Sequence, residues 1–168
     1  MKKKLLENYD NEDRPVKNAS QTIEVTIHPE ITGLVEALET SNTVVAVMSL
    51  AVQWKDEYLT WDAAEWDLDT IFIRSARIWK PDLVFYGISH RESLLEEEKA
   101  LAEVTSEGVV EYHMSVTVHI YCTFDVARFP FDEQRCALQF GSWMFPRDMG
   151  SLLRTQRKAK GFAYSRSR

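Results

Sequence analysis

The stretch VVEYHMSVTVHIY, residues 109–121, decides the fold class. Its even positions, from Val110 to Ile120, carry apolar or aromatic side chains, and its odd positions from Glu111 to His119 are polar. Successive side chains of a strand point to opposite faces, so this alternation predicts a long strand with one buried face. Residues 43–54, TVVAVMSLAVQW, repeat the pattern less cleanly and predict a second long strand.

Further strands are predicted outward from these two, separated by Gly, Pro, Asn and Asp turn signals. Their ranges are 22–28, 58–61, 70–74, 83–86 and 136–140. Many short strands at this spacing predict an all-β chain folded as a β-sandwich. Residues 93–104, SLLEEEKALAEV, fit two interpretations equally well: a short helix capped by Ser93 and Glu96, or a solvated acidic loop.

Length and composition fit one globular domain. The chain has 168 residues, is 45% hydrophobic and 27% charged, and carries a net charge of −6. This acidic balance argues against general nucleic-acid binding, which needs a basic face to neutralise phosphates. No window approaches the ~20 consecutive apolar residues that span a bilayer, and the basic start MKKKLL lacks the apolar segment of a signal peptide. We therefore expect neither a secretion signal nor a membrane anchor in this chain.

The composition changes near the end of the chain. Residues 147–168 hold Lys or Arg at seven positions (147, 154, 157, 158, 160, 166 and 168) against a single acid, Asp148. A basic segment without strand periodicity predicts a disordered or weakly helical tail. The expected organisation is thus a domain over residues 1–146 and a divergent basic tail over residues 147–168.

The only two cysteines, Cys122 and Cys136, enclose thirteen residues, CTFDVARFPFDEQRC. Zinc sites use closely spaced ligand pairs, and His113 and His119 are ~20 Å apart along a strand, so we expect no metal site. No catalytic motif accompanies either thiol, and we expect no enzyme and no cofactor. A disulfide explains the spacing best; it would close a loop of about 15 residues and stabilise the fold by roughly 3 kcal/mol. The pairing would imply an oxidising compartment, with which the possible glycosylation sequon at Asn18 agrees.

Five blocks of sequence together resemble one family. The segment Phe129-Pro130-Phe131-Asp132 inside C-x13-C resembles the signature loop of the Cys-loop ligand-gated ion channels, which are pentameric neurotransmitter receptors. Four further blocks resemble the same family and follow in its order. They are LLENYDNEDRPV (5–16), WKDEYLTWD (54–62), IWKPDLVFY (78–86) and FGSWMF (140–145).

The resemblance implies an immunoglobulin-like β-sandwich with a short N-terminal helix, assembled as a pentamer that binds agonist between subunits. Tyr86 and Trp143 would be two walls of an aromatic box, which holds a quaternary ammonium through cation–π attraction. Phe129, Pro130, Phe131 and Asp132 would form a loop at the rim facing the membrane domain, where binding is coupled to gating. Four other residues of these blocks would be structural, namely Trp54, Trp61, Trp79 and Asp82.

The sequence departs from the nicotinic pattern on the complementary half of the site. Ser49 stands where the family has a tryptophan, on the strand face opposite Met48 and Leu50. Glu111 and His113 occupy positions that are typically apolar in nicotinic sites. The expected ligand is therefore a small neurotransmitter, with an acetylcholine-like amine as one candidate and not the only one.

The resemblance ends at Phe145, before the strands that would complete the sandwich and before any transmembrane helix. We expect a sandwich that is incomplete at the C-terminus, from a partial or alternatively spliced subunit. As part of a full-length receptor it would lie on the extracellular side of the plasma membrane, beside homologous subunits, and touch the membrane only through a domain absent from this chain. The alternative is a secreted, soluble homologue that binds ligand or modulates assembly without channel activity.

Overall fold

The structure is a computed structural model and describes residues 1–96, 98–129, 131–142, 153–157 and 162–165. These residues form two single-turn α-helices, two 3₁₀ turns and eleven strands. The helical elements are α1 (Lys2–Leu5), η1 (Glu39–Ser41), α2 (Ala63–Trp66) and η2 (Ser75–Arg77). The strands are β1 (Ile23–Leu38), β2 (Thr43–Lys55), β3 (Thr70–Arg74), β4 (Leu83–Tyr86), β5 (Ile88–Ser93), β6 (Leu101–Thr105), β7 (Val109–Tyr121), β8 (Glu133–Cys136), β9 (Gln139–Ser142), β10 (Leu153–Arg157) and β11 (Phe162–Ser165).

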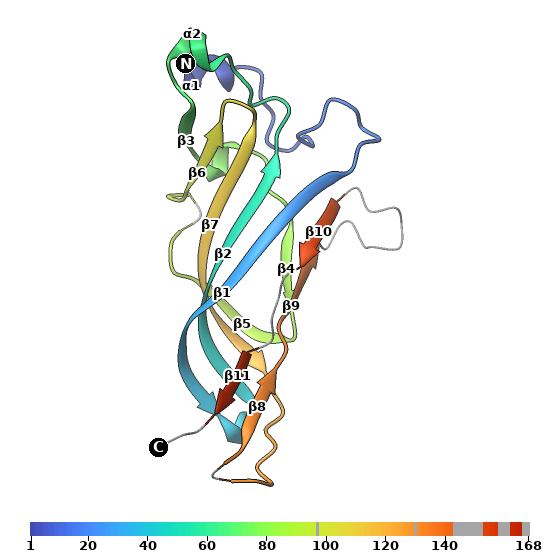
Figure 1. Cartoon of the computed structure of the whole chain (residues 1–168), viewed down its shortest axis with the longest axis vertical. Helices are drawn as coiled ribbons and strands as arrows, with labels where there is room; N and C mark the ends of the chain where they lie inside the picture. Colours follow the sequence, from blue (N-terminus) through green and yellow to red (C-terminus); the bar gives the residue numbers. More distant parts are fainter. Residues whose placement is uncertain (97, 130, 143–152, 158–161, 166–168) are drawn as a thin grey trace.

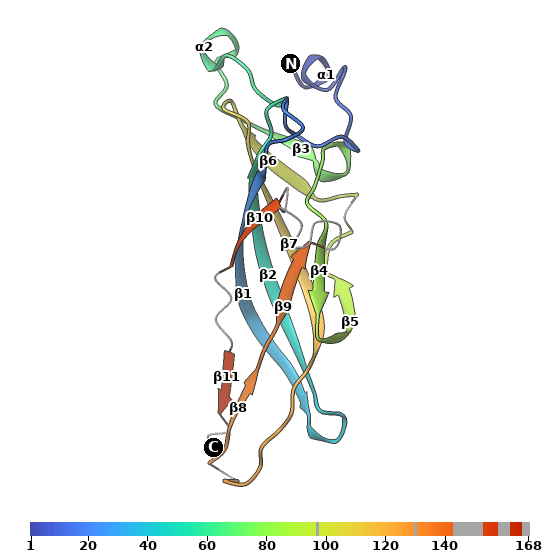
Figure 2. The same ribbon diagram turned by 90° about the vertical axis from the view of Figure 1, so that its right-hand side faces the viewer.

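One large sheet and two small ones make up the all-β sandwich. The large sheet has the order β10-β1-β2-β7-β6-β3, and β5 also pairs with β7. The two-stranded sheets are β4–β9 and β8–β11. All described pairs are antiparallel except β1 with β10. Figure 1 shows α1 and α2 at one end of the elongated molecule and the loop before β8 at the other; in Figure 2 the β4–β9 pair lies across from β1 and β2.

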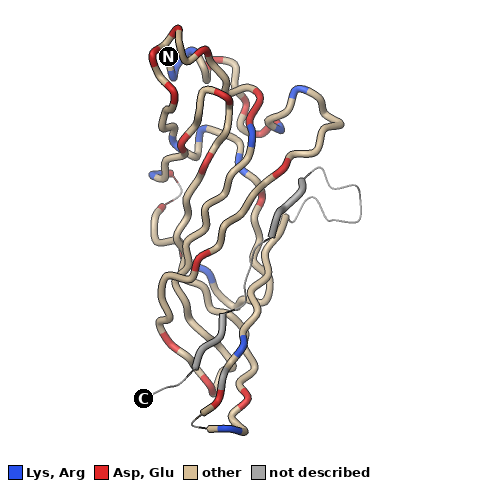
Figure 3. The backbone as a smooth tube through the Cα atoms, viewed as in Figure 1, with Lys and Arg blue, Asp and Glu red and all other residues tan. Residues whose placement is uncertain are grey.

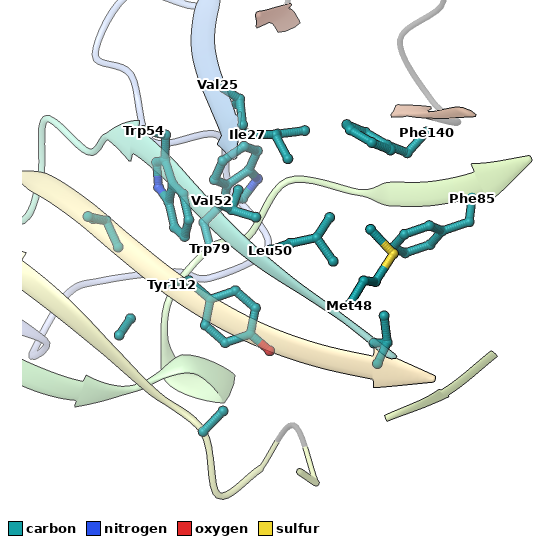
Figure 4. Packing of buried hydrophobic residues seen from close by; sticks show 14 of the residues in the cluster. Val25, Ile27, Met48, Leu50, Val52, Trp54, Trp79, Phe85, Tyr112 and Phe140 are labelled. Atoms are coloured by element: carbon teal, nitrogen blue, oxygen red, sulfur yellow. The ribbon is translucent and has the colours of Figure 1, made fainter. Parts of the chain in front are cut away.

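The core fills the space between the large sheet and the β4–β9 pair. The even-numbered side chains of β2 and β7 point into it, including Met48, Leu50 and Val116, which are almost completely buried. Phe85 of β4 and Phe140 of β9 pack against each other from the other side, with ring centroids 6.2 Å apart (Figure 4). Burial of this apolar surface from both sheets supplies the main stabilising free energy of the domain.

The strands with the clearest patterns are confirmed. The ranges 70–74, 83–86 and 109–121 match β3, β4 and β7, and β2 ends one residue beyond the predicted 43–54. The short N-terminal helix implied by the family resemblance is α1. β3 and most of β7 alternate between more buried and more exposed positions, so the period of two carries the information that local propensity lacks.

Four local predictions differ from the structure in element type or bounds. Residues 58–61 form no strand: residues 57–59 form a turn and a bend and residues 60–61 have no regular structure, because the Asp56 carboxylate accepts a hydrogen bond from the Tyr58 backbone N–H (2.9 Å) and diverts the chain from a ladder. The predicted strand 22–28 continues to Leu38, because β1 pairs with β2 through irregularities that accommodate Gly33. Residues 136–140 divide between β8 and β9. Residues 93–104 hold the end of β5, a turn and β6, instead of a helix or one long loop.

Two strands lie where the sequence predicted a disordered tail. β10 pairs in parallel with Ile23–Ile27 of β1, and β11 pairs with β8. Backbone hydrogen bonding to available strand edges forms this regular structure, and the composition of the segment carries no sign of it. Among the described helices, none combines the length and apolar character needed to cross a membrane.

Candidate functional site

Three of the predicted binding residues share the outer face of the large sheet. Ser49 of β2 lies opposite Ser115 of β7, and His113 and Glu111 follow on β7 opposite Ala51 and Gln53. All are odd-numbered positions of the two alternating strands, so they point away from the core. Ser49 is half-buried and His113 is exposed. The strand alternation correctly predicted that Ser49 lies opposite Met48 and Leu50 and that Glu111 and His113 lie on the polar face of residues 109–121. That these three residues bind a ligand stays a prediction.

The side chains of Glu111 and His113 are in hydrogen-bond contact on that face. The distance between His113 Nε2 and Glu111 Oε1 is 2.8 Å, and both side chains are largely accessible to solvent. Residues two apart on one strand point the same way, which is why this pair can form without help from another element. The pair gives the face a carboxylate and an imidazole in place of an aromatic lining.

Tyr86 lies at the end of β4, in the other layer of the sandwich. It is 39% exposed, whereas its neighbour Phe85 is buried. The Tyr86 hydroxyl donates a weak hydrogen bond (3.5 Å) to the carbonyl oxygen of Ser142 at the end of β9. Trp143, the second predicted aromatic wall, follows Ser142 directly and lies outside the described residues. Tyr86 therefore sits beside the backbone that leads to Trp143.

The two predicted halves of the site do not meet within one chain. Phe85 and Leu50 both point into the shared core, one from each layer (Figure 4). Their sequence neighbours Tyr86 and Ser49 therefore point outward on opposite surfaces of the sandwich. A ligand cannot touch both groups of one molecule at once.

The two cysteines form the predicted disulfide. Cys122 and Cys136 are bonded, with a Cα–Cα distance of 5.0 Å, and both are buried. The bond joins the end of β7 to the end of β8. With both sulfurs bonded, neither cysteine is available as a metal ligand or nucleophile. The described residues contain no group of three or more His, Cys, Asp or Glu side chains placed to hold a metal ion.

A buried glutamine organises the loop enclosed by the disulfide, and the sequence interpretation missed it. The Gln134 amide donates to the Asp125 carbonyl oxygen (2.9 Å) and to Asp132 Oδ2 (2.6 Å). Its oxygen accepts from the Asp125 backbone N–H at 2.9 Å. Gln134 is two residues before the inward-facing Cys136, and this period-two relation was the available signal.

The loop presents its aromatic residues to solvent. Phe129 is 63% exposed and Phe131 is 87% exposed, while Asp132 between the loop tip and β8 is buried. The Oδ1 atom of Asp132 has no hydrogen-bond partner among the described groups. Pro130 lies outside the described residues.

A buried network at the opposite end joins α1 to the sandwich, and it was also missed. The Tyr9 hydroxyl donates to Asp56 Oδ2 (2.6 Å) and accepts from the Trp79 backbone N–H (3.0 Å). Burial raises the pKa of the Asp56 carboxyl and that of the Tyr9 hydroxyl. Trp54 packs edge-to-face on Trp79 with ring centroids 5.9 Å apart.

Two more residues of the resembling blocks, and Asn18 outside them, have defined contacts. Trp61 Nε1 donates to the Leu68 carbonyl oxygen (2.7 Å), and Asp82 accepts a hydrogen bond from the Ser142 hydroxyl (2.7 Å). Asn18 is exposed and its Oδ1 accepts from the Ser20 backbone N–H at 3.0 Å. Glycosylation of Asn18 stays a prediction.

Comparison with known proteins identifies the family. The model of the neurotransmitter-gated ion-channel ligand binding domain matches residues 1–165. The chain belongs to this family. The match extends beyond Phe145, where the resembling blocks end, and the family is one of ligand-gated channels and not a known class of enzyme.

The relatives are subunits of neuronal acetylcholine receptors. Human subunit alpha-9 is 33% identical over 142 residues, which are 84% of this chain and 29% of that subunit. Rat subunit alpha-10 is 33% identical over 140 residues, covering 83% of this chain and 31% of that subunit. Rat subunit alpha-6 is 33% identical over 142 residues, or 84% and 29% of the two chains. The chain spans less than a third of the length of these relatives.

Proposed function

We propose that this chain is the extracellular ligand-binding domain of a nicotinic-like channel subunit at the plasma membrane. It binds a small cationic neurotransmitter between neighbouring homologous subunits of a pentamer and couples binding to gating through residues 122–136. One observation carries the proposal: Tyr86 and the group Ser49, Glu111 and His113 lie on opposite surfaces of one sandwich. Such a divided site is complete only when the Tyr86 surface of one subunit faces the Glu111 surface of the next.

Ring assembly follows from this geometry. An interface between two different surfaces is heterologous, and heterologous interfaces close into rings when the rotation between subunits permits. The relatives that carry the same domain are receptor subunits by name, which supports assembly with homologous chains. Each interface would then offer Tyr86 to the polar face of the neighbour.

The half of the site that carries Glu111 and His113 favours amines with N–H donors. A quaternary ammonium has no N–H to donate, so it gains little from a carboxylate beyond charge attraction. A primary or secondary ammonium can donate a charge-assisted hydrogen bond to Glu111 while its charge faces the tyrosine ring. We therefore propose an amine ligand with N–H donors in preference to acetylcholine itself.

Mixing two variants tests whether the site is shared between chains. Neither Tyr86→Ala nor Glu111→Gln alone should assemble an intact site, so each variant should lose specific binding of labelled amines. When the two are co-assembled, about a quarter of the head-to-tail interfaces pair an intact Tyr86 surface with an intact Glu111 surface. Binding should return at these interfaces.

Matched controls separate binding from folding. Tyr121→Ala and Glu107→Gln also remove an exposed tyrosine and an exposed glutamate, and should bind as the unaltered chain does. Circular dichroism and light scattering verify fold and assembly for every sample. If the co-assembled variants remain inactive while oligomers form, the divided site is wrong. If oligomers bind no amine in any form, the ligand class is wrong.

A further inference from the structure

Two histidines outside the proposed ligand site lie side by side on the large sheet. His90 of β5 is the direct register partner of His119 of β7. Their ring centroids are 5.3 Å apart and their planes are nearly perpendicular, at 88°. Within the described part of the chain, no hydrogen bond or ion pair engages either imidazole. Both rings therefore keep a nitrogen lone pair for another ligand.

An irregularity in β5 creates this pairing. Ile88 is opposite Ile120, and a register shift follows before His90 meets His119. Without the extra residue, Ser89 would face His119 and His90 would lie on the core-facing side opposite Val118. Bulges of this kind turn a side chain to the other face of a sheet. Here the bulge brings the second imidazole beside the first, on the outer face.

We propose that His90 and His119 bind a divalent transition-metal ion such as Zn²⁺. Each Zn–N bond is ~2.0–2.1 Å long and the ring centre lies roughly 1 Å beyond the nitrogen, so two imidazoles on one tetrahedral ion have centroids about 5 Å apart. The observed 5.3 Å matches this spacing. The broad χ2 rotation of histidine is sufficient to turn one nitrogen of each ring towards a shared position.

The site is an open one. Two imidazoles fill half of a tetrahedral shell, and water completes it, which makes the affinity lower than that of a closed structural zinc site. Imidazole ligands select zinc, copper and nickel over calcium and magnesium. Glu92, opposite Thr117, and Glu36, opposite Val45, occupy the same face by register and add negative charge around the ion.

A metal ion bound by His90 and His119 would link the edge strand β5 to β7. In the described structure β5 pairs only with β7, whereas β7 also pairs with β2 and β6. A ligand that binds the folded state and not the unfolded chain raises the melting temperature, and the rise grows with the logarithm of the ligand concentration above Kd. Zinc should therefore raise the melting temperature of the whole chain, and a chelator should reverse the rise.

Zinc titration of the full chain with its disulfide intact tests the proposal. Isothermal titration calorimetry with ZnCl₂ should give one equivalent bound. His90→Gln and His119→Gln should each weaken binding at least tenfold, whereas His28→Gln, which removes another exposed histidine, should leave it within twofold. His113→Gln should likewise have little effect. Zinc affinity of either the His90→Gln or the His119→Gln variant equal to that of the unaltered chain, or loss of binding in the His113 variant alone, would overturn the site.

Spectroscopy of the unaltered chain gives an independent answer that needs no variant. On addition of one equivalent of Cu²⁺, electron paramagnetic resonance should show coupling to two nitrogen nuclei. In zinc titrations, the side-chain NMR signals of two histidines should shift together and saturate at the same ratio. A single coupled nitrogen, or no response to millimolar metal, would leave the two rings as a packing contact and refute the proposal.

Discussion

Two buried aspartates sit at opposite ends of the sandwich and differ in how their charge is satisfied. At the N-terminal end, formed by α1, α2 and the 105–109 turn, Asp56 accepts from the Tyr9 hydroxyl and the Tyr58 backbone N–H, one on each oxygen. At the loop end, residues 122–136, Asp132 accepts from Gln134 on one oxygen only. Charged residues lie mostly at the N-terminal end and at the loop end, whereas the middle of the long strands is mostly uncharged (Figure 3).

The buried aspartate of the N-terminal end has a hydrogen-bond partner on each oxygen, whereas the loop end keeps unsatisfied and exposed groups. Asp56 belongs to a network that ties the first residues of the chain to β2 and to Trp79, so its contacts serve stability. The loop end has a covalent cross-link, exposed Phe129 and Phe131, and a buried carboxylate oxygen without a partner among the described groups. Unpaired buried oxygen and exposed aromatic surface both gain free energy from contact with another body. The loop end therefore has the properties expected of the proposed coupling surface.

Among the variants that test the two ends, the largest effect is expected at Gly108, which closes the N-terminal end. Its φ is +82°, and a Cβ there would collide with the Asp56 carbonyl oxygen. Gly108→Ala should cost about 3–4 kcal/mol of unfolding free energy, from left-handed backbone strain plus overpacking. Gly87→Ala is the matched control, since its φ is +73° and nothing lies within 4 Å, so it should cost only ~1–2 kcal/mol. Equal losses in urea unfolding would contradict the close contact.

Removal of the disulfide tests the loop end. The double variant Cys122→Ala/Cys136→Ala should lose about 3 kcal/mol in urea unfolding, because the bond restricts a loop of about 15 residues in the unfolded chain. The unaltered chain in reducing agent should behave in the same way, and reducing agent should not affect the variant. A loss well below 1 kcal/mol would mean that the Gln134 network holds the loop without the bond.

Tyr9→Phe probes the buried network with less disruption. The change removes the hydroxyl that pairs with Asp56 and accepts from Trp79, and leaves both groups buried without that partner. The expected cost is about 2 kcal/mol of unfolding free energy. Tyr121→Phe removes a hydroxyl from an exposed ring and should cost almost nothing. If both variants unfold alike, the network contributes no stability.

Strand periodicity predicted the fold where it was strict, and failed where pairing overrode local signals. β7 has six alternating apolar positions and was predicted with its observed bounds. The predicted strand 22–28 falls ten residues short of the end of β1, because pairing with β2 continues to Leu38 past Pro29 and Gly33 despite two irregularities. Residues 58–61 carry mostly apolar side chains like a strand, and the hydrogen bond from the Tyr58 backbone N–H to the Asp56 carboxylate turns the chain there instead.

The same period explains which parts of the site were predictable. Ser49, Glu111 and His113 all have odd numbers, and this alone placed them on one face. Odd positions of β2 pair with odd positions of β7, so the two strands share the same outward face. The Tyr9–Asp56 contact joins residues 47 apart in sequence, and the His90–His119 pair depends on a bulge. Neither a long-range contact nor the place of a bulge follows from an alternating pattern.

Neighbouring carboxylates should give opposite pH effects. Burial raises the pKa of Asp56, so the unfolded chain ionises first and stability should fall as pH rises above ~4. The Lys17 backbone N–H lowers the pKa of Glu57, so its contribution is present above ~4.3 and should be lost as pH falls below that value. Asp56→Asn should flatten the first dependence and Glu57→Gln the second, in urea unfolding from pH 3 to 7. Parallel changes in both variants would contradict the opposite environments.

The smallest effect is expected at Phe131, and its smallness is informative. The ring is 87% exposed, so Phe131→Ser removes apolar surface that is already in water and should change the unfolding free energy by less than about 0.5 kcal/mol. Phe140→Ala, which empties a core position, should cost ~3–5 kcal/mol under the same conditions. A large loss at Phe131 would show that the ring packs within the chain. Near-neutrality would mean that the free domain gains nothing from this exposed ring, so its contribution would have to come from contact with another surface.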